Sequence, residues 1–417
     1  MNGLLPQLSA YADRRTARFH MPGHKGVLPP PFDGIAPLDV TELPGTGDLY
    51  HERDGVIRRS ERAMAALYGA ADCFYLTGGA TQGIFAMLSS VTRPGDTVRV
   101  DRACHRSVYN ALILLDLRPV WFTRSREETC GAGRTRQPVI YTSPDYFGVI
   151  APPPQTDGPV LCDAAHGAHL PFCTDGYAPP GNLWVVSAHK TLGALGQTAC
   201  LLSDGNVGAE LLRERTAIFG TASPSFVLLA SLDAARAELE RNGRTAWGRV
   251  AAFTRSLAEK DGRVLKTADP AKLVVFTGNG TGDAERLEHE FGVVCEMAGA
   301  DFFVLMLSPH NTDGDLTRLE KALEAIPERD HARERPGEAG GVPFGLAEAV
   351  MTPREAFFAE RERIALSGAD GRVAACVFAP FAPGVPVFAP GERIDKKALE
   401  ILAGMCYTED TPIWVVR

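Results

Sequence analysis

The chain has 417 residues, of which 45% are hydrophobic and 23% charged, the composition of an ordinary globular protein. Its formal net charge of −8 argues against a nucleic-acid partner, and no run of about 18 apolar residues is present that could cross a membrane. The nine cysteines form no CxxC pair, which excludes a disulfide framework and a standard zinc knuckle. This use of cysteine, with an N-terminus that lacks a signal-peptide pattern, predicts a cytoplasmic protein.

The first half of the sequence has the pattern of an α/β domain. Residues 1–50 show little periodicity, and we expect an irregular arm there. From Asp54 onward, short apolar strands alternate with helices, which is typical of a mostly parallel sheet with helices on both faces. The expected strands cover residues 73–76, 97–100, 120–122, 139–142, 160–162 and 183–186. The expected helices cover residues 56–68, 81–90 and 107–115.

The second half predicts a smaller α+β part. A long amphipathic helix is expected from Pro224 to about Glu240. After it, strands are expected at residues 272–276, 293–296, 302–307 and 373–378, and helices at residues 283–290 and 315–326. We therefore divide the chain into an arm at 1–50, a large domain at 51–245 and one or more small C-terminal domains at 246–417.

Polar residues follow four of the predicted strands directly. A Gly-rich turn opens a helix at Ala80 and Thr81, and His105, Asp163 and the run Ser187–Lys190 follow three other strands. In an open α/β sheet, ligands bind beyond the carboxyl ends of the strands. Together these residues fit one anionic, aromatic ligand that bears a carbonyl group.

Each of these residues also has an ordinary structural explanation. The Gly-rich turn matches neither GxGxxG nor a P-loop, and Thr81 could simply cap a helix. A lysine beside an apolar strand, such as Lys190, can form a Schiff base, but it can also be a surface lysine. Asp163 could pair with the pyridine nitrogen of pyridoxal 5′-phosphate (PLP) or could cap a turn. His105 could stack on a ring or cap a helix.

Five segments together resemble the ornithine/lysine/arginine decarboxylase family. They are Arg18–Gly26, Asp39–Leu43, Asp163–His169, Ser187–Leu192 and Pro383–Glu392, and they occur in the family's order between about residues 15 and 395. That family is PLP-dependent and has the aspartate-aminotransferase fold (fold type I). The resemblance implies an α/β fold, with a mostly parallel PLP domain of the seven-stranded type, helices on both faces, and a smaller C-terminal α+β domain.

The resemblance also implies roles around the cofactor ring. Lys190 would carry PLP as a Schiff base, Asp163 would bind the pyridine nitrogen, and His105 would stack on the ring opposite Ala165. Loss of CO2 leaves a carbanion, which the ring can delocalise only while its nitrogen stays protonated, and Asp163 favours that cation. Lys190, His105 and Asp163 are therefore the predicted catalytic residues, and Lys190 or a nearby histidine would return the proton.

A second group of residues would hold the cofactor phosphate. The resemblance assigns this role to the N–H of Ala80 and to the side chains of Thr81, Ser187 and His189. The sequence departs from the family in three places: at Thr46–Asp48, where a more acidic stretch is common, at Ala103, where asparagine is common, and at residues 123–137, which look short. The receiver-like N-terminal domain of the large acid-induced enzymes is absent, so their decameric assembly is not expected.

The expected reaction is decarboxylation of arginine, lysine or ornithine, which would place the enzyme in polyamine biosynthesis. An aminotransferase or a β-eliminating lyase would use the same cofactor, with Arg354 or Arg372 available for a substrate carboxylate. A metallohydrolase could use Asp163, His166 and His169, but we expect no metal, since metal clusters rarely adjoin a Ser-x-His-Lys run. A non-enzymatic binding protein of this fold is the fourth alternative.

A cationic substrate needs a carboxylate partner, which the strand ends do not supply. The candidates are Glu42 and Asp48 in the arm and Glu392 after a proline-rich stretch, and His166 is a further candidate for substrate contact. The resemblance implies a homodimer with shared active sites. We therefore expect the arm, or the segment around Glu392, to reach the cofactor of the partner subunit.

Overall fold

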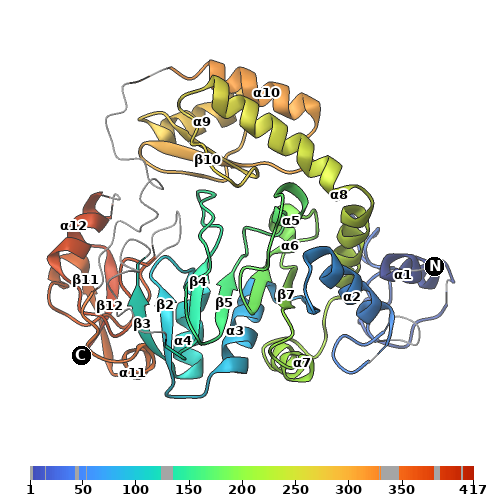
Figure 1. Ribbon diagram of the computed structural model, residues 1–417, viewed down its shortest axis with the longest axis horizontal. Coiled ribbons are helices and arrows are strands. Elements are labelled where there is room, and N and C mark those ends of the chain that lie inside the picture. Colours follow the sequence, from blue (N-terminus) through green and yellow to red (C-terminus); the bar gives the residue numbers. More distant parts are fainter. Residues whose placement is uncertain are drawn as a thin grey trace.

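The computed structural model describes the chain except for residues 1–2, 15, 43–46, 53, 124–134, 328, 330–346, 380–385 and 405–406. The described part contains three sheets, which belong to a large central domain, a small domain and a C-terminal domain (Figure 1). In Figure 1 the small domain lies above the central sheet and the C-terminal domain lies at its left. None of the described helices has the length and apolar composition needed to cross a bilayer.

The central sheet has seven strands in the order β1-β7-β6-β5-β4-β2-β3. They are β1 Asp72–Leu76, β2 Thr97–Asp101, β3 Arg118–Phe122, β4 Val139–Thr142, β5 Val160–Asp163, β6 Leu183–Val186 and β7 Ala199–Ser203. Strands β6, β5, β4, β2 and β3 pair in parallel, and β7 is antiparallel to both β1 and β6. The predicted mostly parallel sheet is confirmed, whereas β7 was not predicted.

Helices cover both faces of this sheet because its strands are apolar on both sides. In β6, Leu183 and Val185 join the core under α3 (Gly79–Val91) and α4 (Arg106–Leu115). Trp184 and Val186 point the other way, into the core under α2 (Val56–Tyr68) and α8 (Phe226–Lys260). Alternate side chains of a strand point to opposite faces, so these two cores confirm the predicted helices on both faces.

Helix α3 lies unusually close to the sheet. A Cβ added at Gly83 would come within 2.6 Å of the side chain of Val185, so only glycine permits this approach. The close packing brings the first turn of α3, with Ala80 and Thr81, towards the carboxyl edge of the sheet.

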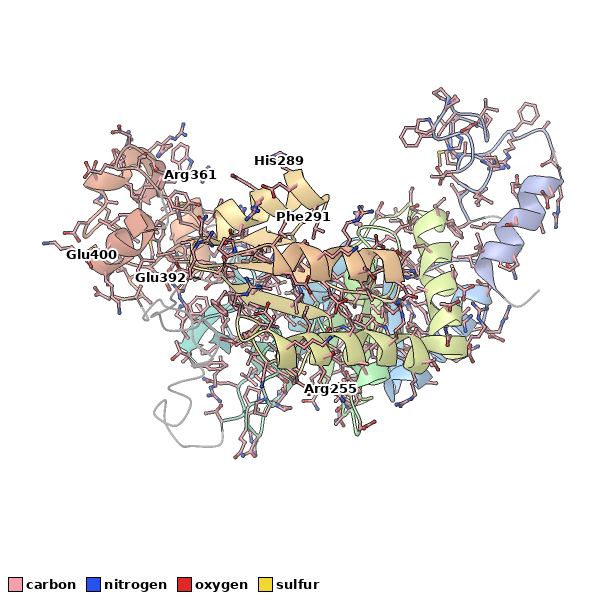
Figure 2. The ribbon with its side chains drawn as sticks, turned by 90° about the horizontal axis from the view of Figure 1, so that it is seen from above. Arg255, His289, Phe291, Arg361, Glu392 and Glu400 are labelled. Carbon is pink, nitrogen blue, oxygen red and sulfur yellow. The ribbon has the colours of Figure 1, made fainter. Side chains whose placement is uncertain are left out.

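The N-terminal segment contains a helix that the sequence did not predict. Helix α1 (Leu4–Asp13) buries Leu4 and Leu8. The N–H of Leu4 donates to Oδ2 of Asp233 at 2.7 Å, which ties α1 to α8. Part of the arm that follows α1 stands out from the body of the molecule (Figure 2), whereas Val40 and Leu49 join the buried core. The expectation of an irregular arm was therefore wrong for α1, because two buried leucines suffice to dock it.

Helix α8 continues 20 residues beyond its predicted end at Glu240 and passes the predicted domain boundary at residue 245 without a break. It leads into the small domain, where β8 (Lys272–Phe276), β10 (Phe302–Met306) and β9 (Met297–Ala298) form an antiparallel sheet. Helices α9 (Gly280–Phe291) and α10 (Asp313–Glu324) complete it. The strand predicted at 293–296 was wrong: Val294 is 71% exposed, so this run lacks the burial that pairs a strand.

The C-terminal domain is built on β11 (Arg361–Ala365) and β12 (Pro412–Val416), which pair antiparallel. Helices α11 (Pro353–Phe358) and α12 (Lys396–Gly404) belong to it. The strand predicted at 373–378 was wrong, since this stretch forms only isolated bridges, such as that between Phe378 and Phe388. The helix α7 (Ala209–Ile218) precedes α8, and the short helices α5 (Leu170–Cys173) and α6 (Ala188–Thr191) follow β5 and β6.

Candidate active site

Predicted site residues follow the carboxyl ends of three parallel strands of the sheet, β2, β5 and β6. Asp163 ends β5, the run from Ser187 to Lys190 follows β6, and His105 follows β2 as the N-cap of α4. Backbone bonds join these loops, since the N–H of Ser187 donates to the carbonyl of Ala165 at 3.2 Å. The parallel order of the sheet thus places them along one edge.

Asp163 is a buried carboxylate at the centre of this edge. Its side chain is 3% exposed, and its Oδ1 accepts from the N–H of Ala165 at 3.1 Å. Burial lowers the pKa of Lys190, and the charge of Asp163 opposes that change. Asp163 has the same opposing influence on His105, whose pKa the surrounding protein lowers. The carboxylate therefore acts on both residues and favours a cation beside it.

His105 is held by the first turn of its own helix. Its Nδ1 accepts from the N–H of Ser107 at 3.2 Å and lies 2.8 Å from the Ser107 hydroxyl. The residue as a whole is exposed. This arrangement fixes the ring through Nδ1 and leaves its faces free to pack against a planar ligand.

Lys190 contacts a histidine and, through it, a second lysine. Its Nζ lies 2.7 Å from Nε2 of His166, and Nζ of Lys272 lies 2.6 Å from Nδ1 of the same ring. Lys272 is the first residue of β8 in the small domain and is 0% exposed. The small domain therefore contributes a buried amine to the site.

The ring of Tyr146 packs against the ring of His166. The two rings lie 4.6 Å apart, and the Tyr146 hydroxyl donates to Oε1 of Glu296 at 2.7 Å. Glu296 is exposed, and its charge raises the pKa of both Lys190 and Lys272 against the effect of burial. An exposed carboxylate of the small domain thus lies within electrostatic reach of the two lysines.

The residues predicted to hold the phosphate lie at two helix starts. Ala80 and Thr81 belong to the first turn of α3, where unpaired N–H groups and the helix dipole favour an anion. Ser187 is 1% exposed and precedes α6. Nδ1 of His189 donates to the carbonyl of Thr198 at 2.9 Å, so only Nε2 of that ring can face a ligand.

The donor set of this edge fits PLP. The Thr77 hydroxyl, just before the Gly-rich turn, is buried and has no hydrogen-bond partner among the described residues. A helix N-terminus and hydroxyl groups suit a phosphate, a buried carboxylate suits a pyridinium nitrogen, and a lysine whose pKa is lowered suits a carbonyl. Lys190, Asp163, His105, Ala165, Thr81 and Ser187 could therefore hold this cofactor.

The structure does not bring the predicted substrate carboxylates to this edge. Glu42 is exposed on the arm. Asp48 accepts from the N–H groups of Tyr50 and His51 at 2.8 and 2.9 Å and so stabilises its own loop. His166 is at the site, but as the partner of two lysines.

Glu392 differs most from expectation. Both of its carboxylate oxygens bind Arg102, at 2.7 and 2.9 Å, and neither residue is more than 2% exposed. Figure 2 places Glu392 within the C-terminal domain of the same chain. A carboxylate already paired in the interior has no oxygen to offer a substrate, so we do not retain Glu392 as a substrate ligand. Through its ion pair with Arg102, Glu392 instead stabilises the loop between β2 and His105.

The histidines of the metallohydrolase alternative point in different directions. His166 faces the lysines, whereas Nε2 of His169 lies 2.6 Å from Oδ1 of Asp269 and its ring stacks on Trp247 at 4.4 Å. Within the described ranges, no three His, Cys, Asp or Glu side chains come together as a metal site. The bond between His169 and Asp269 links the large and small domains.

Sequence reasoning missed Lys272, Tyr146 and Glu296. Lys272 carried a weak signal, because a lysine that directly begins an apolar strand must bury its stem. Tyr146 and Glu296 carried none, since their role depends on how the small domain packs on the loop after β4.

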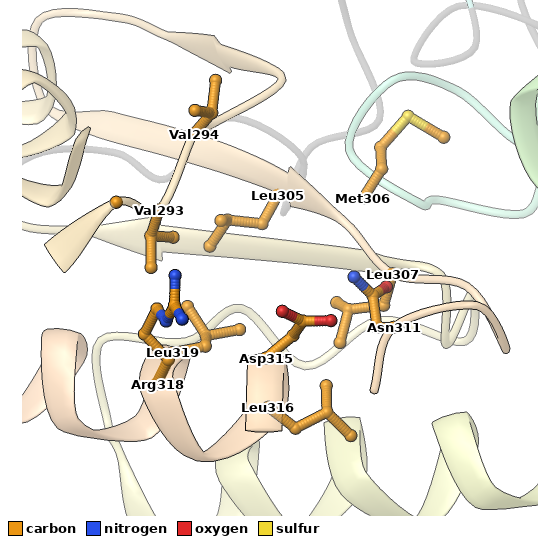
Figure 3. Close-up of a pocket in the computed structure, with 11 residues that line it drawn as sticks. Val293, Val294, Leu305, Met306, Leu307, Asn311, Asp315, Leu316, Arg318 and Leu319 are labelled. Atoms are coloured by element: carbon orange, nitrogen blue, oxygen red, sulfur yellow. The ribbon is translucent and has the colours of Figure 1, made fainter. Parts of the chain in front are cut away.

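A separate cavity of about 170 Å³ lies in the small domain between β10 and α10 (Figure 3). Leucine and valine side chains line it together with Asn311, Asp315 and Arg318. The carboxylate of Asp315 is occupied in the capping box of α10, where it accepts from the N–H of the N-cap residue Thr312 at 2.8 Å. None of the predicted site residues lines this cavity, so it is not part of the candidate active site.

Comparison with known proteins gives a consistent result. The family model "Orn/Lys/Arg decarboxylase, major domain" matches residues 3–138, and "Orn/Lys/Arg decarboxylase, C-terminal domain" matches residues 343–411. An arginine decarboxylase of Halalkalibacterium halodurans is 28% identical over 94% of this chain and 90% of its own length.

Two solved structures show the fold. The constitutive lysine decarboxylase of Escherichia coli aligns with a TM-score of 0.80 and 19% identity, over 100% of this chain and 82% of that one. A structure titled "SPT with PLP" aligns with a TM-score of 0.53 and 18% identity, over 65% of this chain and 76% of that one.

Together with the fold, these comparisons define an amino-acid decarboxylase built on a seven-stranded, mainly parallel sheet. The chain belongs to the Orn/Lys/Arg decarboxylase family. The expected family and fold are confirmed. The relatives include both arginine and lysine decarboxylases, so family membership fixes the type of reaction and leaves the amino acid to be determined.

Proposed function

We propose that this enzyme uses PLP to remove CO2 from a basic amino acid, namely arginine, lysine or ornithine. The observation that carries the proposal is the placement of a buried carboxylate, Asp163, and a partly buried amine, Lys190, at the ends of the adjacent strands β5 and β6. The charge of the first raises the pKa of the second against the effect of burial, so the two groups lie within electrostatic reach of each other.

Bound PLP would withdraw electrons from the substrate α-carbon, which is the chemistry that loss of CO2 requires. Asp163 would hold a proton at the pyridine nitrogen, because a buried carboxylate favours a neighbouring cation. His105 would pack on one ring face and orient it. Thr81 and Ser187, with the N–H of Ala80, would bind the phosphate and fix the position of the reacting bond.

Lys190 and His166 are the groups that could return a proton to the α-carbon. Nζ of Lys190 and Nε2 of His166 are 2.7 Å apart, so both can lie near the same reacting atom. Tyr146 packs against His166 with its ring tilted by 56°, and in this position it would help to exclude water from this side of the site. A dry site strengthens the electrostatic effect of Asp163.

The preference for a basic amino acid would come from Glu296. A substrate ammonium or guanidinium group needs a carboxylate partner. Glu296 is exposed, has Oε1 fixed by the Tyr146 hydroxyl, and acts on Lys190 through its charge. It is therefore the candidate that replaces Glu392 in this role.

We further propose that two copies form a homodimer through the N-terminal arm. The arm exposes a series of large apolar side chains: Phe19, Met21, Val27, Phe32 and Ile35. Phe19 is 95% exposed, and exposed apolar clusters of this kind mark interfaces. Sedimentation of the native protein and of a variant with Phe19→Ser and Phe32→Ser tests this, with a dimer expected only for the native protein.

Product analysis tests the reaction. The PLP-loaded protein is incubated with arginine, lysine, ornithine and leucine, and CO2, amine and oxo acid are measured. We expect CO2 and amine in equal amounts from at least one basic amino acid and neither from leucine. Lys190→Ala is the matched control and should give no product. An oxo acid without CO2 would identify an aminotransferase and reject the proposal.

A further inference from the structure

Two lysine amines approach the same imidazole, one at each ring nitrogen. Nζ of Lys190 lies 2.7 Å from Nε2 of His166, and Nζ of Lys272 lies 2.6 Å from Nδ1. Lys272 is fully buried and His166 is 7% exposed, so little water competes for these contacts. The three side chains form a continuous hydrogen-bonded row from the small domain to the candidate cofactor lysine.

The number of protons in this row is limited. A neutral imidazole has one N–H and one lone pair, and a lysine ammonium can only donate. Two ammonium groups would therefore leave the ring N–H facing a donor. While the ring is neutral, one of the two amines must therefore be neutral as well, so that its lone pair can accept a hydrogen bond from the ring N–H.

The surrounding protein keeps the imidazole of His166 neutral, and it lowers the pKa of both lysines so that either one can carry the positive charge. Burial lowers the pKa of His166 well below its usual value, and the positive charges of Lys272 and Lys190 lower it further. Burial lowers the pKa of Lys272 to about 8 and also lowers that of Lys190. The other charged or titratable groups that act on the row are His105, Asp145, Asp163, His169, Asp269 and Glu296.

We propose that Lys272 is a positioning residue that takes the proton of Lys190 through the imidazole of His166. The proposal rests on the proposed function of Lys190 as the amine that binds the cofactor. The Lys190 ammonium gives a proton to Nε2 of His166, and Nδ1 of the same ring gives its proton to the Lys272 amine. Lys190 is left with a free lone pair, Lys272 becomes an ammonium, and the ring is neutral again.

This transfer would serve both ends of the reaction cycle. A lysine attacks a carbonyl only as a free amine, and Lys272 supplies the place for the proton that Lys190 gives up. Reversal of the two transfers returns the proton to Nζ of Lys190, where it is available for the substrate. The count of protons is the same before and after each transfer, so no other acid or base is required.

The test measures the free amine of Lys190 in the full-length protein without cofactor. The protein is pulsed with acetic anhydride between about pH 6 and pH 11, and acylation of the Lys190 peptide is followed by mass spectrometry. Lys272→Met removes the acceptor, so Lys190 should keep its proton to higher pH. Its acylation near pH 8 should fall about tenfold, which corresponds to a pKa higher by about one.

Two further variants separate the proposal from a structural role. Lys272→Arg keeps a permanent donor at Nδ1 and so places the ring proton on Nε2, opposite Lys190. In the Lys272→Arg variant, acylation of Lys190 near pH 8 should equal or exceed that in the native protein. Lys260→Met is the matched control, because Lys260 is exposed and lies far along α8, and it should leave the Lys190 profile unchanged. Identical profiles in the native, Met and Arg proteins would overturn the proposal.

A variant of the ring tests the path. In a His166→Phe background, Lys272→Met should move the Lys190 profile by less than half of its effect in the native background, since the connecting nitrogens are gone. An undiminished effect would mean that the amines interact through space, and the relay would be rejected. Borohydride reduction with PLP separately tests whether Lys190 binds the cofactor, so failure of the proposed function and failure of the relay are distinguishable.

Discussion

Replacement of Lys272 by methionine is expected to stabilise the protein at pH 7, although Lys272 lies in the candidate active site. Lys272 is 0% exposed, and burial lowers its pKa from 10.5 to about 8. At 1.36 kcal/mol per pH unit, this difference corresponds to roughly 3 kcal/mol of folding free energy lost by keeping an ammonium group in the interior. Methionine fills a similar volume without charge, but it leaves Nδ1 of His166 without its partner, at a cost of about 1 kcal/mol. The net gain should be about 2 kcal/mol.

The sign of the pH dependence follows from where the proton is lost. The unfolded chain keeps the lysine proton up to about pH 10.5, whereas the folded chain releases it near pH 8. Between these values the unfolded state binds more protons, so the stability of the native protein rises with pH. The advantage of Lys272→Met should therefore shrink over this range. Above it, the variant should be less stable than the native protein by about 1 kcal/mol, because the neutral lysine still bonds His166.

Urea unfolding of the cofactor-free proteins, followed by circular dichroism at about pH 7 and pH 10.5, measures both values. The matched control is Lys260→Met, whose exposed lysine lies 3.9 Å from Glu320, and it should differ from the native protein by less than about 0.5 kcal/mol at either pH. If Lys272→Met were destabilised equally at both pH values, the reasoning would be refuted, because Lys272 would then contribute packing and not a buried charge.

Four further results are expected. Lys190→Ala should lose the visible absorption that PLP gives the native protein, and borohydride should attach no cofactor to it; a labelled peptide with another lysine would contradict the assignment. Asp163→Asn should lower kcat by about 10²–10⁴, or roughly 3–5 kcal/mol, and near-normal turnover would exclude its role at the ring nitrogen. Glu392→Gln leaves the guanidinium of Arg102 unpaired in the interior, so urea unfolding should show a loss of about 3 kcal/mol or more, with an unchanged KM in the folded enzyme. Glu296→Gln should raise KM for a basic amino acid about tenfold and change kcat less, and an unchanged KM would remove it from the substrate site.

The strand-end positions of the site could be predicted from the sequence because they depend on local pattern alone. Short apolar runs end at Asp163 and just before Ser187, and a parallel sheet must place such ends along one edge. The mostly parallel sheet and the helices on both of its faces followed from the alternation of strands and helices, whereas its seven-stranded type was implied only by the family resemblance. The order of the strands did not follow from the alternation, since it is set by long connections that carry no periodic signal.

The remaining features depend on contacts between distant segments. Lys272 becomes part of the site only because the small domain packs over the loop after β5. Glu392 was predicted to face a substrate because a cationic substrate needs a carboxylate and long irregular segments are usually functional. Its pairing with Arg102 could not be predicted from either local sequence. Helix α8 continued past its predicted end because Trp247, Val250 and Leu257 are buried by contacts with segments distant in sequence, such as the stacking of Trp247 on His169.

The ion pair between Arg102 and Glu392 has a consequence for synthesis of the chain. Its two partners are 290 residues apart, and one of them stands three positions before His105. Arg102 also donates to the carbonyl of Val387, so the loop after β2 is completed by a segment that is synthesised 285 residues later. Until the ribosome has released that segment, a buried guanidinium would have no counter-charge, and such a charge is strongly unfavourable. Assembly of the His105 loop must therefore wait until Glu392 has left the ribosome, and a nascent chain arrested before Glu392 should contain a sheet whose ligand edge is still unformed.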